Sequence, residues 1–375
     1  MSQPLPTFQA PHQPAPHWLR SLLVLLLIVI TAQTTTAASL TWSGFVSDEW
    51  TNPLNWVPNR VPTSADDVLI PGTYTPGTPL STSTFPGTTP TPNQPMVRIA
   101  GQTANAIAMN TVAVLTLATN GSLNVATDIV NNGGTLNSRG GTLTVSGNLT
   151  TSNGAFNSTG GNVTVSGSFT NTTSTVSSTG GNLVIGGSLT NTGGTITGSG
   201  GTFTVGGSFS NATAAATFVL NSGSTLNLGG NFTNSGGTVG GSGTGRLALT
   251  GSVVQTVGGT LSTFPNLTVG SASATTTGPV SILATGGVVL NGRLAIGTNQ
   301  AFTLLSDANG TAYVANNSGS VATGRATVQR YIAPNLNAGP GYRHYSTPVS
   351  GNTVDDFSTT SYTPVVNSSY NNSAT

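Results

Sequence analysis

Acidic and basic side chains, which move protons and hold cations in most enzymes, are scarce in this chain. Among 375 residues there are only eight acids and nine bases. From Ile129 to Ser306 there is no Asp, Glu, His or Lys. Glycoside hydrolysis needs paired carboxylates and metal-assisted chemistry needs ligands for the ion. We therefore expect a non-catalytic protein with no metal and no other cofactor. The acids are Asp48, Glu49, Asp66, Asp67, Asp128, Asp307, Asp355 and Asp356.

Two small groups of polar residues could still carry chemistry. The pair Asp66 and Asp67 could bind a cation, but we interpret it as a solvated acidic turn, since surface carboxylates are common. His344 has Ser346 and Asp355 nearby in the sequence. A catalytic triad is defined by geometry and not by closeness in sequence, so we assign no triad to them.

Three of the four tryptophans, Trp42, Trp50 and Trp56, lie close together near the start of the chain. Aromatic rings are large contributors to hydrophobic cores, and the end of a repeat array has to be covered. We therefore interpret these residues as a cap over the first repeat. A platform on which sugar rings stack is the alternative, and it would make the same three residues a carbohydrate-binding site.

A repeat of twenty residues begins at Gly121, and the structure that it forms must position the residues discussed above. Its apolar residues are spaced by two, four and seven, which fits strands with one buried face and no helix. The third position holds Leu123, Leu143, Val163, Leu183 and Phe203. The fifth holds Val125, Val145, Val165, Ile185 and Val205, and the ninth holds Ile129, Leu149, Phe169, Leu189 and Phe209. The sixteenth holds Leu136, Phe156, Val176 and Ile196, after which the column breaks.

Glycine and asparagine recur at fixed places in this repeat. Paired glycines such as Gly160-Gly161, and single ones such as Gly167, predict corners at which glycine allows positive φ. The recurring Asn131, Asn171, Asn191 and Asn211 would stack as a ladder of amides. One coil cannot bury enough apolar surface to be stable alone, so the coils must stack. The predicted fold is all-β, a parallel β-helix (β-solenoid) with coils of about 20 residues.

The sequence on either side of the repeat divides the rest of the chain. Arg20 followed by an apolar run at 21–30 and small residues near Ala38 predicts a cleaved signal peptide over 1–38, with no membrane span afterwards. We expect an N-terminal cap and a Pro/Thr-rich loop over 39–100 and solenoid repeats over 101–307. Charged and aromatic residues return after Gly324, so 308–375 is interpreted as the start of a C-terminal β module, cut short.

Several short motifs resemble the large secreted repeat proteins of Bacteroidetes. They are Asn55-Trp56, Val61-Pro62, Asp66-Asp67-Val68, the segment from Thr263 to Val269, and the segments 328–332 and 342–349. The resemblance implies a β-solenoid located outside the cell or on its outer surface. Such proteins usually end in a C-terminal sorting domain, and none is recognisable here.

These observations predict an exported structural or adhesin-like rod. Its partners would be surface glycans or other cell-surface proteins. The net charge of +1 gives no electrostatic case for binding nucleic acid. A carbohydrate-binding surface module is the alternative. A polysaccharide-degrading enzyme remains a third hypothesis only if its site lies outside this chain.

Overall fold

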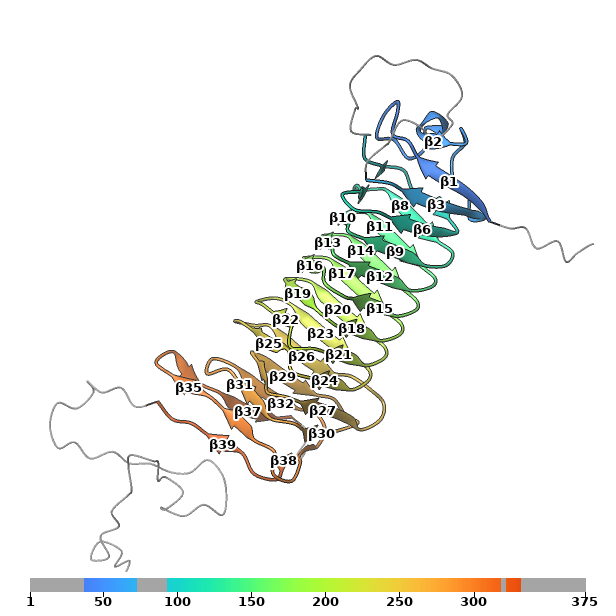
Figure 1. Ribbon diagram of the computed structural model, residues 1–375. Coiled ribbons are helices and arrows are strands. Elements are labelled where there is room, and N and C mark those ends of the chain that lie inside the picture. The colour runs from blue at the N-terminus through green and yellow to red at the C-terminus, as the bar shows by residue number, and fades with distance from the viewer. Residues whose placement is uncertain (1–36, 73–92, 318–321, 332–375) are drawn as a thin grey trace, which may run out of the picture. The chain divides into compact units, whose positions relative to one another are not determined.

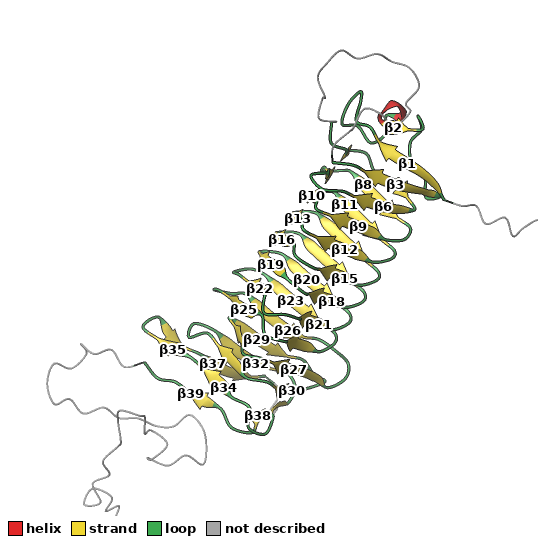
Figure 2. Cartoon of the chain, viewed as in Figure 1, coloured by secondary structure: helices red, strands yellow, loops and turns green. Residues whose placement is uncertain are grey.

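The computed structural model describes residues 37–72, 93–317 and 322–331, and within them the protein is all-β. The strands wind into a parallel β-solenoid of about 11 turns of about 20 residues, as the sequence predicts (Figure 1). The only helix in the described part is the 3-10 turn η1 (Pro53–Asn55) at the N-terminal end (Figure 2). The predicted signal peptide and residues His344, Ser346 and Asp355 lie outside the described residues.

The first sheet of the solenoid has 14 strands and runs along the described part of the rod. All its pairings are parallel except that of β1 with β2, which is antiparallel. Its strands are β2 (Trp56–Val57), β1 (Ala38–Trp42), β3 (Asp66–Ile70), β6 (Ala106–Met109), β9 (Ile129–Asn132), β12 (Leu149–Ser152), β15 (Phe169–Asn171), β18 (Leu189–Asn191), β21 (Phe209–Asn211), β24 (Phe232–Asn234), β27 (Gln255–Gly259), β30 (Ala274–Thr277), β33 (Leu294–Ile296) and β38 (Ala322–Thr323).

Two further sheets, of 8 and 11 strands, form the other long sides. The second sheet contains β25 (Thr238–Gly241), β22 (Ala216–Leu220), β19 (Gly194–Ser199), β16 (Thr175–Thr179), β13 (Ala155–Thr159), β10 (Thr135–Arg139), β7 (Val114–Leu117) and β4 (Met96–Val97). The third contains β37 (Tyr313–Asn316), β32 (Gly287–Leu290), β29 (Asn266–Val269), β26 (Arg246–Leu249), β23 (Thr225–Leu228), β20 (Thr202–Val205), β17 (Asn182–Ile185), β14 (Asn162–Val165), β11 (Thr142–Val145), β8 (Ser122–Val125) and β5 (Gln102–Ala104).

Towards the C-terminal end of the described chain the second side is formed by a separate sheet of four strands. These are β28 (Ser262–Phe264), β31 (Val280–Ile282), β34 (Phe302–Leu304) and β39 (Thr327–Val328). A short hairpin, β35 (Ser306–Asp307) with β36 (Gly310–Thr311), projects beside them. The parallel pairing thus starts at β1 and continues to β38 and β39, so the stacked coils extend on both sides of the expected range 101–307.

The predicted apolar columns are continuous ladders in the structure. Leu143, Val163 and Leu183 pair in register from coil to coil, and each is fully buried. The sequence indicated that the sixteenth column breaks after Ile196, but in the structure it does not. It continues through Phe218 and Val239. The turn between β21 and β22 contains more residues than the matching turn of the preceding coil. Phe218 therefore follows Ile196 by more than one period in the sequence and still pairs with it.

The glycines fall into two physical classes, and only one of them was predicted correctly. Gly140, Gly160, Gly180 and Gly200 have φ values of 79°, 68°, 71° and 79°, as expected of corner glycines. Gly167, in contrast, does not have positive φ. A Cβ there would lie 2.6 Å from the carbonyl oxygen of Gly147 in the preceding coil. Close approach of successive coils therefore explains this second class.

Candidate functional site

The tryptophan cluster forms the core of the N-terminal end. Trp42, Trp50 and Trp56 have side chains exposed by only 0%, 1% and 0%. The ring of Trp56 makes edge-to-face contacts with both of the others, at centroid distances of 4.8 Å to Trp42 and 4.7 Å to Trp50. Such a geometry is favourable for aromatic pairs. No face of these rings is open to a ligand, which is the arrangement expected of a cap and not of a sugar-stacking platform.

Asn55 holds the loop that carries Trp50, and the sequence reasoning missed it. It is fully buried as the last residue of the turn η1, directly before strand β2. Its Oδ1 accepts hydrogen bonds from the backbone N–H groups of Val46 and Ser47, both at 3.0 Å. Its Nδ2 donates to the carbonyl oxygen of Glu49 at 2.9 Å. A buried amide with this many partners fixes a loop, and its position directly before Trp56 was the available signal.

The indole N–H groups of the cluster differ in their hydrogen bonding. Trp42 Nε1 donates to the carbonyl oxygen of Asn93 at 2.6 Å, and Trp56 Nε1 donates to that of Trp50 at 2.8 Å. Trp50 Nε1 is buried and has no acceptor among the described residues. Two of the three rings are therefore fixed by a hydrogen bond as well as by contact.

Asp66 forms the most enclosed ion pair of the described structure. Both its carboxylate oxygens accept hydrogen bonds from the Arg60 guanidinium at 2.5 Å, and Thr63 donates through its backbone N–H and its hydroxyl. The hydrogen bonds from Arg60 hold the pKa of Asp66 well below its ordinary value, against the opposing effect of burial. The side chain is 4% exposed, so the prediction of a solvated turn was wrong for Asp66.

Asp67 lies on the other face of the same strand, because successive side chains in a strand alternate. It is half-buried, and its Oδ1 accepts a hydrogen bond from Asn105 Nδ2 at 2.7 Å. The two carboxylates thus have separate partners. In the described part of the chain no three His, Cys, Asp or Glu side chains are grouped as metal ligands would be.

A second, more exposed charge cluster joins the cap to strand β4. Arg98 contacts Asp48 at 2.7 Å and Glu49 at 2.6 Å, and all three side chains are more than a third exposed. The hydrogen bond from Arg98 lowers the pKa of Asp48. Surface pairs of this kind contribute little to stability because water screens them. We assign this cluster a role in orienting the cap loop.

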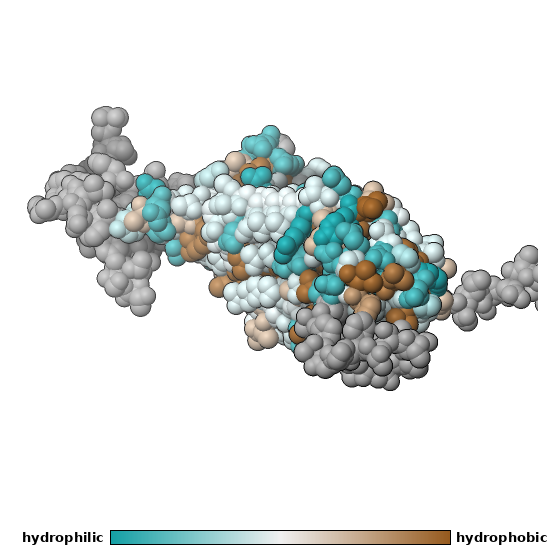
Figure 3. All heavy atoms as spheres, turned by 90° about the horizontal axis from the view of Figure 1, so that it is seen from above, coloured by the Kyte–Doolittle hydropathy of each residue, from teal (hydrophilic) through white to brown (hydrophobic). Residues whose placement is uncertain are grey.

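Most outward side chains of the third sheet are uncharged, and Arg246 on β26 is the exception among the described residues. One row of in-register residues contains Asn124, Thr144, Thr164, Val184, Thr204 and Asn227. Over the solenoid Figure 3 is largely pale, the colour of residues with hydropathy near zero, and stronger colours gather near one end. Hydroxyl and amide groups donate and accept hydrogen bonds but do not ionise near neutral pH. This row can therefore contact a ligand through hydrogen bonds.

Comparisons with protein-family models, with curated protein sequences and with solved structures found no significant match. Within the described residues there is also no helix of the length and apolarity that crossing a bilayer requires. The function is accordingly inferred from the residues and geometry above.

Proposed function

We propose that this protein is an exported, non-catalytic rod that acts outside the cell, as a structural or adhesin-like component of the cell surface. The N-terminal segment 1–38, with its apolar run and small residues near Ala38, supports export. The motifs that resemble secreted Bacteroidetes repeat proteins support the same location. Surface glycans or other cell-surface proteins would be its partners.

One observation carries this proposal: the rod is built from in-register ladders inside and outward rows that carry very few charges. Each coil stabilises its neighbours through parallel strands and buried columns such as that of Leu143 and Val163. Such an array gains length by adding coils, and its stability depends on nearest-neighbour contacts. Between Ile129 and Ser306 only Arg139, Arg246 and Arg293 carry charge. A spacer or an adhesive surface needs length and hydrogen-bonding groups, and both are present.

Surface location can be tested on intact cells that produce the full chain. N-terminal sequencing of the exported protein should show a start after Ala38, and protease added to intact cells should degrade the rod. An unprocessed chain that stays protected inside the cell would contradict the proposal. Incubation of the purified protein with neutral and acidic polysaccharides should release no new reducing ends. Measurable depolymerisation would overturn the non-catalytic part.

A further inference from the structure

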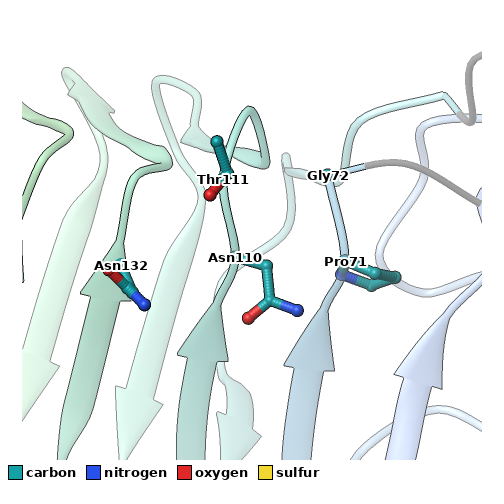
Figure 4. Close-up of a pocket in the computed structure, with 5 residues that line it drawn as sticks. All are labelled: Pro71, Gly72, Asn110, Thr111 and Asn132. Atoms are coloured by element: carbon teal, nitrogen blue, oxygen red, sulfur yellow. The ribbon is translucent and has the colours of Figure 1, made fainter.

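A small cavity lies at the corner of the rod where strands β3, β6 and β9 end. Its volume is about 300 Å³, which is the lower end of the range of small-molecule sites. It is lined by Pro71, Gly72, Asn110, Thr111 and Asn132 (Figure 4). None of these residues carries a charge, and none was singled out from the sequence.

The coil register places three of these residues in one row. Ile70 pairs with Met109 and Met109 pairs with Asn131, so the residues that follow them, Pro71, Asn110 and Asn132, succeed one another along the rod. Neighbouring residues in such a row are about 4.8 Å apart. Figure 4 shows the Asn110 amide between Asn132 and the ring of Pro71. The row thus presents two amides beside an apolar ring.

Much of the hydrogen-bonding capacity of this row is unused. Among the described residues, the Asn110 amide and the Thr111 hydroxyl have no hydrogen-bond partner, and both residues are exposed. Asn132 Oδ1 accepts from the Ser152 hydroxyl at 3.2 Å, which leaves its Nδ2 free to donate. These unpaired groups of Asn110, Thr111 and Asn132 all belong to residues that line the cavity.

The turn that carries Thr111 is strained, which is a second and independent observation. Val112 has φ of 60°, a left-handed conformation that a β-branched residue strongly disfavours. The residues in register with Val112 in the next two coils tolerate it, with φ values of 89° at Gly133 and 56° at Asn153. Val112 is 58% exposed, so burial of its side chain does not compensate the strain. Strain of this kind concentrates at ligand sites.

Gly72 leaves the space that the strained turn occupies. A Cβ at this position would lie 1.7 Å from the carbonyl oxygen of Thr111 and 2.6 Å from Val112 Cγ2. The backbone N–H of Val112 also donates to the carbonyl oxygen of Gly133 at 3.1 Å. The hydrogen bond holds the turn against the next coil and the turn packs closely on Gly72, so the wall of the cavity is preformed, which lowers the entropic cost of binding.

We propose that this cavity binds one sugar unit of a neutral glycan. Amides and a hydroxyl that both donate and accept match the hydroxyls of a sugar, and the Pro71 ring offers an apolar surface for its C–H groups. The absence of charge in the lining selects against phosphate, sulfate and uronate groups. The site is an adhesive contact for the rod and rests on the proposed surface function for its biological role.

The test uses the purified full chain and a panel of neutral oligosaccharides, titrated by calorimetry and by saturation-transfer NMR. At least one neutral oligosaccharide should bind, and Asn110→Ala should weaken that binding tenfold or more. The matched control Asn227→Ala, an outward amide on β23, should leave affinity unchanged. Val112→Gly should also weaken binding while the protein stays folded by circular dichroism, because it releases the turn.

Three results would overturn the site. They are no binding of any neutral oligosaccharide by the wild-type chain, binding of acidic oligosaccharides only, and equal affinity of the wild-type and Asn110→Ala proteins. None of them bears on export, because the titration uses purified protein. If the intact-cell experiment shows surface exposure and the titration shows no binding, the rod function stands and this site falls.

Discussion

Asn171 donates a hydrogen bond from its Nδ2 to Oδ1 of Asn191 over 2.9 Å, one coil further along the rod. Asn191 repeats the contact to Asn211 at 2.9 Å, and Asn211 to Asn234 at 3.2 Å. All four amides are fully buried. Each amide therefore depends on its neighbours for satisfaction, and the ladder ties successive corners together.

Replacing one member of this ladder should be costly. Asn191→Ala removes the donor to Asn211 Oδ1 and to the carbonyl oxygen of Thr217. It also removes one acceptor of Asn171 Nδ2, which keeps its bond to the carbonyl oxygen of Ser174. Each buried group left unpaired costs about 1–3 kcal/mol. We expect a clear loss of unfolding free energy in urea melts. Thr190→Ala, the half-exposed neighbour, is the control and should have little effect. Equal losses for the two variants would contradict the ladder's role.

Two tryptophans of the cap allow a matched comparison of one hydrogen bond. Trp50→Phe and Trp56→Phe remove the same atoms from equally buried rings. Trp56 also loses its donation to the Trp50 carbonyl oxygen, whereas the Trp50 indole N–H has no acceptor to lose among the described residues. Trp56→Phe should therefore be more destabilising by about 1 kcal/mol. Thermal melts of both variants measure this, and a reversed order would contradict the stabilising hydrogen bond assigned to Trp56 Nε1.

Two exposed valines should respond with opposite signs to replacement by glycine. At Val112, with φ of 60°, glycine removes a left-handed strain of about 1–2 kcal/mol. That outweighs the entropic cost of glycine, roughly 0.5–1 kcal/mol, so Val112→Gly should raise the melting temperature. Val130 lies in strand β9, where the same change should lower it. A destabilised Val112→Gly protein would argue against strain at this corner.

The Arg60–Asp66 pair should make stability depend on acid pH. Its hydrogen bonds lower the pKa of Asp66 in the folded state below the unfolded value of about 3.9. The stabilisation is therefore complete above that unfolded value and is lost as pH falls through the folded pKa. Melting temperatures should drop between about pH 5 and pH 2. Asp66→Asn and Arg60→Ala should both have lower melting temperatures at neutral pH and a shallower drop. An unchanged slope in both would exclude the pair as a cause.

The fold could be predicted from the sequence because each coil repeats the same pattern of apolar and polar residues. Leu143, Val163 and Leu183 fall every twenty residues, and alternation with polar residues makes them the inner face of strands. The prediction failed where a corner changed length. The turn between β21 and β22 moves Phe218 out of the counted period, although its place in the stack is unchanged. Counting a fixed period along the sequence does not detect residues that are inserted at a corner.

The candidate site was much less predictable. Asn110 and Asn132 look like any other polar residues of a repeat, and Pro71 lies outside the regular copies. Only the register of β3, β6 and β9 brings them into one row. The strain at Val112 is likewise a property of the backbone that cannot be recognised from the pattern of residue types. The burial of Asp66 was predicted wrongly for a related reason, because its partner Arg60 lies in a loop outside the regular repeat.

The most direct test of the stacked-coil rod is to remove coils in and out of phase. Deletion of 161–200 takes out two complete repeats and joins Gly160 to Gly201, so every column should close again in register. We predict a cooperatively melting protein whose maximum dimension in X-ray scattering is shorter by about 10 Å, at about 5 Å per coil. Deletion of 161–190 removes one and a half repeats and should not fold. Equal behaviour of the two deletions, folded or unfolded, would contradict the account.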